Sequence, residues 1–401
     1  MTPVSAISGV PIPSQPDLAR MRGERYARLQ AQLEAQGLDG LVLLGTSPVT
    51  YATGALTPGA DSSRASLLRP VAVVVKGQAA PHLFTPYPEG APSDLSPDHL
   101  HGPLFPDLAD GGPVAAAAVK ALLPAGARIA IDEQPHPFLA ALDGLRCVSA
   151  AAVLGAAKLC KTPDELACIR TAQQINERAM VPVHAMLRAG VRQVDLTAVF
   201  LREIFELGAT SNGIDPIWQV MPATRAAGPW TVHGDIAFPT PTTDRILRDG
   251  DVIWVDTGIG YEGYASDFGR TWIVGPPTAR QRSQYERWKT VCDAVLAILK
   301  PGASGLDLVR AAIAANDGTK PWIEHFYLAH GIGTDSAEMP LIGTDLGTGF
   351  DERTIMAPGM VVVLEPVIWD DGAAGYRSED VYAVTDDGWV SLSDHPYDPF
   401  P

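Results

Sequence analysis

Acidic residues lie at the ends of the most apolar runs in the C-terminal part of the chain, from residue 252 onward. Asp256 closes the run VIWV, Glu365 closes the run VVVL, and Glu379 stands just before DVYAV. Apolar runs of this length and composition are typical of buried strands. Three strands are therefore expected to carry carboxylates into the interior. The chain is restricted to folds in which these buried negative charges meet at a common site and are neutralised there.

Buried carboxylates need a positive partner. Converging carboxylates in a low-dielectric pocket repel one another and take up protons unless a cation neutralises them. Asp267 and His330 add a further oxygen donor and an imidazole in the same part of the chain. Hard oxygen ligands with one imidazole suit Mn, Co, Fe or Zn, and bridging carboxylates can hold two metals about 3.5–4 Å apart. The pattern predicts a site for two divalent cations.

Four segments carry a family resemblance. They are VDTGIGYEGYASDFGRTW (255–272), AHGIGTDSAEMP (329–340), VLEPVIW (363–369) and YRSEDVYAVT (376–385). In order and spacing they resemble the metal-binding segments of the pita-bread metallohydrolases, the group that contains prolidase, aminopeptidase P and methionine aminopeptidase. The resemblance implies a catalytic domain of long helices covering a mostly antiparallel sheet.

The resemblance also implies a role for each residue of the predicted site. Asp267 and Glu379 would bridge two metals, Asp256 would chelate one of them, and His330 with Glu365 would bind the other. Glu365 is also the family's candidate general base, which receives the proton of the nucleophilic water. Considered alone, Asp256 before Thr-Gly could instead form a strand-end turn, and His330 could be a loop histidine.

Several positions depart from the family pattern, among them Ala329, where the family often has glycine before the metal histidine. Prolidases and aminopeptidases P carry a second histidine seven residues after the metal histidine, as proton donor and carbonyl-polarising group, and here that position is Ala337. Another family histidine precedes the first metal aspartate, and His233 is the candidate for this catalytic role, with an ordinary loop histidine as the alternative. Gly269 stands where the family typically has threonine. These departures concern the substrate more than the metals.

The rest of the chain alternates helix and strand patterns. Helical spacing predicts helices over 15–36, 163–187, 194–207, 280–299 and 306–316, and apolar runs predict strands over 38–44, 71–75, 82–85 and 128–131. The Pro, Gly and Asp content of 86–113 predicts a long surface loop. Segment 37–54 resembles the creatinase/prolidase N-terminal domain, which in that family shapes the substrate entrance and the dimer contact.

These patterns predict three parts of the chain. Residues 1–18 are expected to form a flexible Pro-rich tail, 19–155 an α/β N-terminal domain, and 156–401 an α+β pita-bread catalytic domain. A length of 401 residues with 46% hydrophobic content is enough for two cores.

Composition narrows the partners and the location. The net charge of −16 argues against nucleic acid as a partner, because a basic footprint is missing. No apolar run approaches the roughly 20 residues that span a bilayer, and the N-terminus does not resemble a secretory signal. The four cysteines show no metal-type spacing and are interpreted as reduced thiols in the cytoplasm. A homodimer is implied by the resemblance alone.

Three functional hypotheses follow from this pattern. The first is a dinuclear metallopeptidase of the Xaa-Pro type, either dipeptidase or aminopeptidase, that acts on small peptides. The second is an enzyme that uses the same metal centre to convert a non-peptide small molecule, as ectoine hydrolases or dimethylsulfoniopropionate lyases of this fold do. The absence of the second histidine favours this hypothesis. The third is a non-catalytic pita-bread binding module, against which the filled ligand positions argue.

Overall fold

The computed structural model describes residues 12–57, 68–224, 226 and 243–395. The chain divides into two compact units, one formed by residues 15–164 and the other by residues 165–401 together with residues 1–14. In the described residues, no helix is long and apolar enough to cross a membrane. Each unit has its own core, as the length of the chain suggested.

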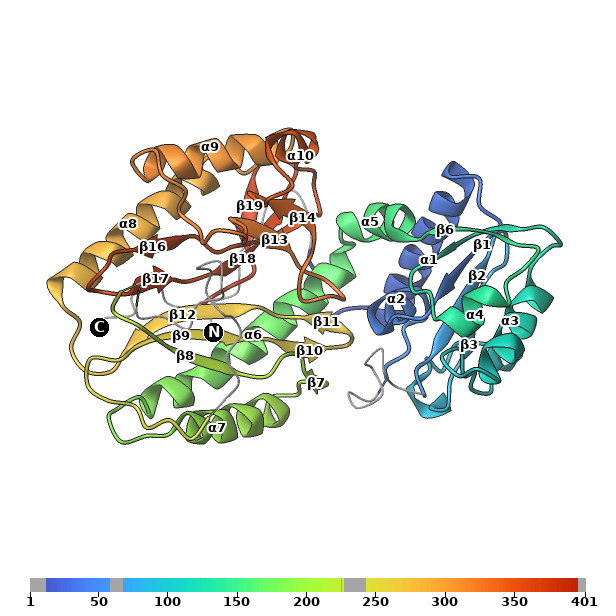
Figure 1. Ribbon diagram of the computed structural model, residues 1–401, viewed down its shortest axis with the longest axis horizontal. Helices are drawn as coiled ribbons and strands as arrows, with labels where there is room; N and C mark the ends of the chain where they lie inside the picture. Colours follow the sequence, from blue (N-terminus) through green and yellow to red (C-terminus); the bar gives the residue numbers. More distant parts are fainter. Residues whose placement is uncertain (1–11, 58–67, 225, 227–242, 396–401) are drawn as a thin grey trace. The chain divides into compact units, whose positions relative to one another are not determined.

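A mixed six-stranded sheet forms the centre of the unit at 15–164 (Figure 1). Its strand order is β4-β3-β2-β1-β5-β6, in which β1 pairs antiparallel with β2 and parallel with β5. The strands are β1 Gly40–Leu43, β2 Val71–Val75, β3 His82–Phe84, β4 Leu100–His101, β5 Arg128–Ile131 and β6 Arg146–Ser149. The helices are α1 Leu18–Ala35, α2 Thr46–Thr53, α3 Gly111–Leu122, α4 His136–Ala140 and α5 Ala151–Leu159.

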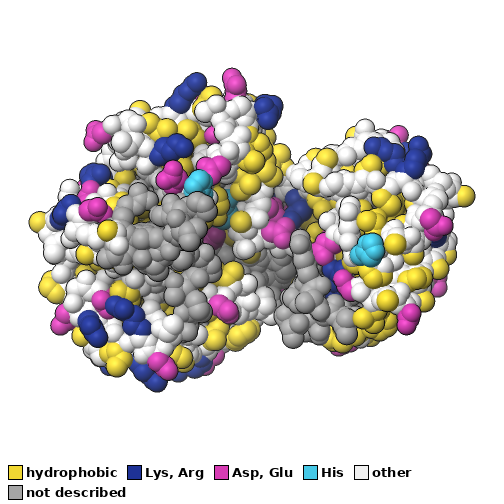
Figure 2. All heavy atoms as spheres, in the orientation of Figure 1, with side chains coloured by type: hydrophobic (Ala, Val, Ile, Leu, Met, Phe, Trp, Pro, Cys, Tyr) yellow, Lys and Arg dark blue, Asp and Glu magenta, His cyan; other side chains and the backbone are white. Residues whose placement is uncertain are grey.

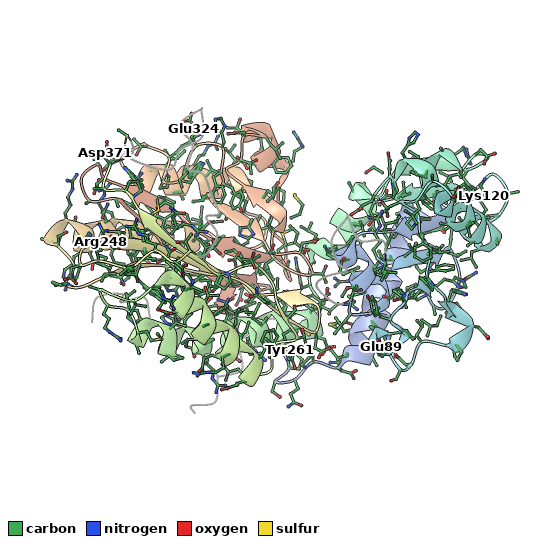
Figure 3. All side chains as sticks on the ribbon, turned by 60° about the horizontal axis from the view of Figure 1, so that its bottom comes forward. Glu89, Lys120, Arg248, Tyr261, Glu324 and Asp371 are labelled. Carbon is green, nitrogen blue, oxygen red and sulfur yellow. The ribbon has the colours of Figure 1, made fainter. Side chains whose placement is uncertain are left out.

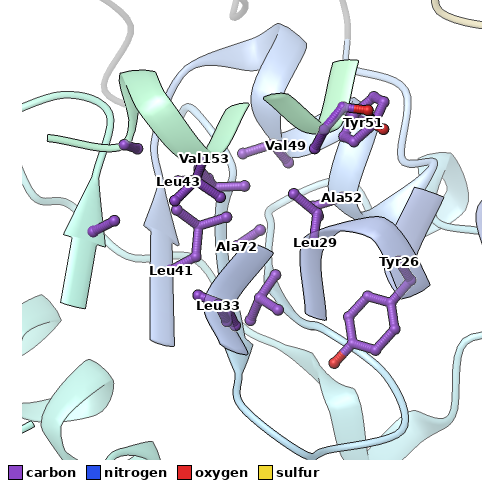
Figure 4. Close-up of a cluster of buried hydrophobic side chains, with 14 of the residues drawn as sticks. Tyr26, Leu29, Leu33, Leu41, Leu43, Val49, Tyr51, Ala52, Ala72 and Val153 are labelled. Carbon is purple, nitrogen blue, oxygen red and sulfur yellow. Dashed lines mark hydrogen bonds between the residues drawn. The ribbon is translucent and has the colours of Figure 1, made fainter. Parts of the chain in front are cut away.

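Side-chain alternation along the central strand places a core on each face of this sheet. Leu41 and Leu43 pack with Leu29 of α1 and Val153 of α5 on one face (Figure 4). Val42, between them, packs on the other face in the cluster that contains side chains of α3 and α4. The unit is therefore a three-layered α/β/α structure, which confirms the predicted α/β class.

Antiparallel sheets and long helices form the second unit (Figure 1). The sheets have the orders β11-β10-β7, β12-β9-β8, β14-β13-β15-β18-β19 and β16-β17. The helices are α6 Pro163–Ala185, α7 Gln193–Glu206, α8 Ala279–Leu296, α9 Gly305–Ala315 and α10 Thr348–Arg353. The first strands are β7 Ser211–Asn212, β8 Ile217–Met221, β9 Val252–Thr257, β10 Ile259–Tyr261, β11 Tyr264–Ala265 and β12 Phe268–Ile273. The later strands are β13 Ala329–Gly331, β14 Glu338–Ile342, β15 Val361–Leu364, β16 Val367–Trp369, β17 Gly375–Arg377, β18 Asp380–Val384 and β19 Trp389–Ser391.

Apolar helix faces cover the strands that bear the acids. Met180 of α6 and Phe200 of α7 belong to the same buried cluster as Ile253 and Val255 of β9 and Trp272 of β12. The predicted long helices are confirmed within three residues at each end. The predicted loop at 86–113 is wrong in part, because it contains β4 and two short 3₁₀ helices, Pro88–Gly90 and Pro97–His99, and α3 begins inside it.

Candidate metal centre

Strand pairing brings three of the predicted acids close together. Asp256 at the end of β9 lies opposite Gly269 of β12. Gly269 in turn forms an isolated bridge with Glu379, whose backbone nitrogen donates to the Gly269 carbonyl at 3.0 Å. The 11-residue excursion between the two aspartates contains the β10–β11 hairpin, which returns the chain so that Asp267 precedes β12. Ligand atoms of Asp256, Asp267 and Glu379 all lie within 4.8 Å of one another.

The other two predicted residues approach from the five-stranded sheet. His330 of β13 pairs with Val363 of β15, two residues before Glu365. Its Nε2 atom lies 3.3 Å from Asp267 Oδ2 and 3.4 Å from Glu365 Oε1. The structure thus brings together all five residues that were predicted as ligands, which lie up to 123 positions apart in the sequence.

Figure 3 shows Arg248, Tyr261, Glu324 and Asp371 at the rim of the same unit.

A buried guanidinium lies among the acids. Arg377 donates from Nη2 to Glu379 Oε2 and to Glu365 Oε2, both at 2.7 Å. Nη1 and Nη2 each lie 3.1 Å from Asp256 Oδ2. A guanidinium is suited to this position because its planar fork offers five donors in fixed directions.

One guanidinium does not neutralise four carboxylates. Burial raises the pKa of the Asp267 carboxyl well above its ordinary value, and the charges of Asp256 and Glu365 raise it further, while Arg377 opposes the shift. Burial also raises the pKa of Glu379 well above its ordinary value, again against Arg377 and with the help of Asp267. Without another cation, these two groups therefore hold protons at a pH where free carboxyls are ionised.

The unused donor atoms fit divalent cations. Oε1 of Glu365 and Oε1 of Glu379 are buried, and neither accepts a hydrogen bond from any residue in the described ranges. Nδ1 of His330 lies 2.9 Å from the Gly331 carbonyl, which can only accept, so Nδ1 carries a proton. In the neutral imidazole the Nε2 lone pair then faces two carboxylate oxygens, an arrangement that a metal ion between them would stabilise.

Polar side chains of α6 hold the backbone on either side of the aspartates. Asn176 donates from Nδ2 to the Thr257 carbonyl at 2.8 Å and to Ser266 Oγ at 2.9 Å, and its Oδ1 accepts from Thr257 Oγ1. Gln173 Oε1 accepts from the Asp267 backbone nitrogen at 3.1 Å. Both amides are fully buried. They fix the residues next to Asp256 and Asp267, and thereby the separation of these two acids.

The sequence did not identify these two amides. Their partners beside the two aspartates lie 81 to 94 positions away, and two of these four partners are backbone atoms, so no spacing pattern marks them. The one available signal was their position on the same face of the predicted helix as Ala172 and Ile175. Two amides on an apolar helical face require buried partners.

The departures from the family pattern have different structural outcomes. Ala337 is exposed, in the segment between β13 and β14. At Gly269 an added Cβ would collide with the carboxylate of Glu379. His233 lies outside the described residues, so its catalytic assignment stays a prediction.

Gly269→Ala is expected to weaken metal binding by about 10–100-fold, the range seen when groups that orient ligands are lost. A Cβ atom at this position would lie 2.3 Å from Glu379 Oε1 and 2.5 Å from its Cδ. Because β12 is paired along its whole length with β9, the carboxylate has to move rather than the strand. Metal titration followed by calorimetry measures the change. Gly155→Ala is the matched control, since nothing lies within 4 Å of its added Cβ, and equal affinities in both variants would contradict the prediction.

Glu177 is expected to make the stability of the protein decrease between about pH 4.5 and pH 7. Burial raises the pKa of this carboxyl to about 7, against the backbone hydrogen bond from Asp394. In that window the unfolded chain has lost the proton while the folded protein still holds it, so stability falls as pH rises. Below the window both states are protonated and the contribution vanishes.

Urea unfolding of the metal-free protein at several pH values tests this expectation. Glu177→Gln retains an oxygen that accepts from the Asp394 nitrogen and has no proton to lose, so its stability should change less with pH. The prediction fails if wild type and Glu177→Gln show parallel pH profiles.

Sequence comparison gives two matches that divide the chain between them. Residues 167–386 match Metallopeptidase family M24, and residues 25–150 match the Creatinase/Prolidase N-terminal domain. The probable dipeptidase PepE of Mycobacterium tuberculosis is 30% identical over 396 residues, which cover 94% of this chain and 97% of that protein. An Xaa-Pro dipeptidase of Pyrococcus furiosus is 29% identical over 238 residues, 59% of this chain and 63% of that protein.

Solved structures have the same fold. Dipeptidase PepE from Mycobacterium ulcerans superposes with a TM-score of 0.73 at 25% identity, covering 96% of this chain and 98% of that one. Prolidase from Pyrococcus horikoshii OT3 also gives a TM-score of 0.73, at 21% identity, and covers 94% of this chain and all of that one. The predicted combination of an α/β N-terminal domain with a pita-bread domain is confirmed by these matches.

Proposed function

Because this chain belongs to metallopeptidase family M24, we propose that it is a metal-dependent dipeptidase that hydrolyses small peptides with proline in the second position. Relatives named as dipeptidases and as Xaa-Pro dipeptidases support the peptide substrate. They also favour it over the ectoine-type and dimethylsulfoniopropionate-type alternatives.

The convergence of five ligand-type groups on one buried point carries the proposal. Asp256, Asp267, His330, Glu365 and Glu379 would hold the metal ions. When bound, divalent ions there supply Lewis-acid activation of water and of the scissile carbonyl. The donor set fits two ions, with manganese as the first choice and cobalt, zinc or iron as alternatives.

Glu365 is proposed as the general base. Arg377 fixes its Oε2 atom at 2.7 Å and leaves Oε1 on the side of His330 and Asp267. A carboxylate oxygen held in this way is oriented to accept a proton from an attacking water and to pass it to the leaving nitrogen. His233 is proposed as a second catalytic group on the family resemblance. A homodimer in the cytoplasm is part of the same proposal.

Metal analysis and peptide hydrolysis test the proposal together. The purified protein is loaded with Mn, Co or Zn, its metal content is measured, and Xaa-Pro dipeptides, Xaa-Pro-Xaa tripeptides and matched Xaa-Ala peptides are followed by mass spectrometry. Two metals per chain with cleavage of Xaa-Pro dipeptides is the expected result. Cleavage of the tripeptides alone would reassign it as an aminopeptidase, and bound metal without any peptide cleavage would overturn the peptidase proposal.

A further inference from the structure

The five predicted ligands are rich in acceptors and short of donors for a substrate. The four carboxylates only accept when ionised, His330 Nδ1 donates to the Gly331 carbonyl, and the Arg377 fork contacts three carboxylates. A peptidase also needs a donor for the carbonyl oxygen that becomes negative as the amide is attacked. Relatives of the prolidase type place a histidine at the position of Ala337, whose methyl group cannot donate.

Tyr327 lies beside this centre and has no role in the predicted site. It precedes the metal-site histidine by three residues, in the segment where the Glu365 backbone nitrogen donates to the Leu328 carbonyl at 3.1 Å. Its ring meets the His330 ring edge-on, with centroids 5.1 Å apart and planes at 65°. The Tyr327 ring also stacks on the Phe326 ring, with centroids 4.1 Å apart and planes at 18°. Two aromatic contacts therefore fix the half-buried ring next to His330.

The Tyr327 ring lies against the His330 imidazole, and the next residue, Leu328, accepts a hydrogen bond from the Glu365 backbone nitrogen, so Tyr327 lies beside two of the predicted ligands. A phenol has an ordinary pKa of about 10, so the hydroxyl is protonated at neutral pH and can donate a hydrogen bond. No residue in the described ranges accepts a hydrogen bond from it.

We propose that Tyr327 takes the place of the missing histidine and donates a hydrogen bond from its hydroxyl to the carbonyl oxygen of the scissile amide. This inference rests on the proposed peptidase function and adds a substrate-contacting residue to it. The phenol loses no proton in the reaction, because its part is to stabilise the charge that develops on the oxygen. The donor in this chain would thus come from Tyr327, before β13, whereas its relatives supply a histidine from the position of Ala337, after β13.

Kinetics of four metal-loaded proteins test the proposal. Tyr327→Phe keeps the ring contacts with Phe326 and His330 and removes only the hydroxyl. It should lower kcat for an Xaa-Pro dipeptide by about 10²-fold, the usual effect of removing one oxyanion donor, with KM and metal content unchanged. Ala337→His should restore activity to the Tyr327→Phe protein more than it raises activity in wild type. Tyr261→Phe, at the rim of the unit in Figure 3, is the control.

A binding experiment tests the contact without turnover. The zinc-loaded protein, which is diamagnetic, is labelled with ¹³C at tyrosine Cζ, and the Tyr327 resonance is assigned by its absence from Tyr327→Phe. A phosphinic isostere of alanyl-proline is then added, whose oxygens mimic the attacked carbonyl. A shift of the Tyr327 resonance on binding is expected.

The two experiments separate failure of this inference from failure of the proposed function. Wild-type turnover that survives Tyr327→Phe, with an unshifted resonance, overturns the role of Tyr327 and leaves the peptidase function standing. If wild type cleaves no peptide, the peptidase function fails, and the resonance alone decides the role of Tyr327: a shift supports the donor and no shift overturns it. The resonance also decides if Tyr327→Phe loses its metal.

Discussion

Asp267→Asn is expected to abolish peptide hydrolysis, with kcat falling by far more than the roughly 100-fold that follows loss of an outer-shell partner. Oδ2 of Asp267 lies 3.3 Å from His330 Nε2, and the carboxylate is within 4.8 Å of ligand atoms of Asp256 and Glu379. Asp267 therefore lies between His330 on one side and the pair Asp256 and Glu379 on the other. Asparagine keeps the shape but offers one neutral oxygen, so it cannot join two cations as a carboxylate does. Metal content should fall together with activity.

The same substitution should not destabilise the metal-free protein. The raised pKa of Asp267 means that the folded state keeps a proton which the unfolded chain loses above about pH 4. This difference costs stability as pH rises above that value, and a neutral side chain removes the cost. Asp267→Asn should therefore unfold at equal or higher urea concentration than wild type at neutral pH without metal, and should lose the stabilisation that metal gives.

Asp293→Asn provides the matched control, because Asp293 is exposed on α8. It removes one charge and leaves the candidate site intact, so activity and metal content should match those of wild type. Full activity of Asp267→Asn would reject the bridging assignment. If Asp267→Asn loses activity but keeps both metals, Asp267 would have a catalytic role and would not be needed to bind the metals.

Local sequence patterns predicted the secondary structure that carries the site. The valine-rich runs before Asp256 and Glu365 form β9 and β15, because β-branched residues favour buried strands wherever they occur. Helices with a continuous apolar face, such as α6 and α7, were equally visible. The short elements inside 86–113 were not, since β4 has only two residues and forms only by pairing with β3. Tertiary contacts, rather than propensity, decide such elements.

Contacts between distant segments were outside the reach of pattern analysis. Asn176 of α6 bridges Thr257 and Ser266 through geometry that exists only after folding. Order and spacing predicted which acids converge. They did not predict that a Cβ at Gly269 would collide with the Glu379 carboxylate.

Arg377→Met is expected to destabilise the metal-free protein by about 3–5 kcal/mol, the usual cost of removing one partner from a buried ion pair. The guanidinium is buried and contacts Asp256, Glu365 and Glu379 at 2.7–3.1 Å. Methionine fills a similar volume but leaves these carboxylates without that positive charge. They must then take up protons or repel one another, and either outcome raises the free energy of the folded state.

Metal should reverse most of this loss. Bound divalent cations supply positive charge to the same carboxylates, so the cost of losing Arg377 should be smaller in the loaded protein. Since binding to the folded state stabilises it, the gain in the free energy of unfolding on adding metal should be larger for Arg377→Met than for wild type. Urea unfolding with and without metal gives both quantities.

Arg377→Lys separates charge from geometry. Lysine keeps one positive charge and loses the planar fork that reaches three carboxylates at once. Its stability without metal should fall between those of wild type and Arg377→Met. If Arg377→Met without metal is as stable as wild type, the carboxylates are neutralised by their own protons, and Arg377 serves to orient the ligands rather than to hold the empty site together.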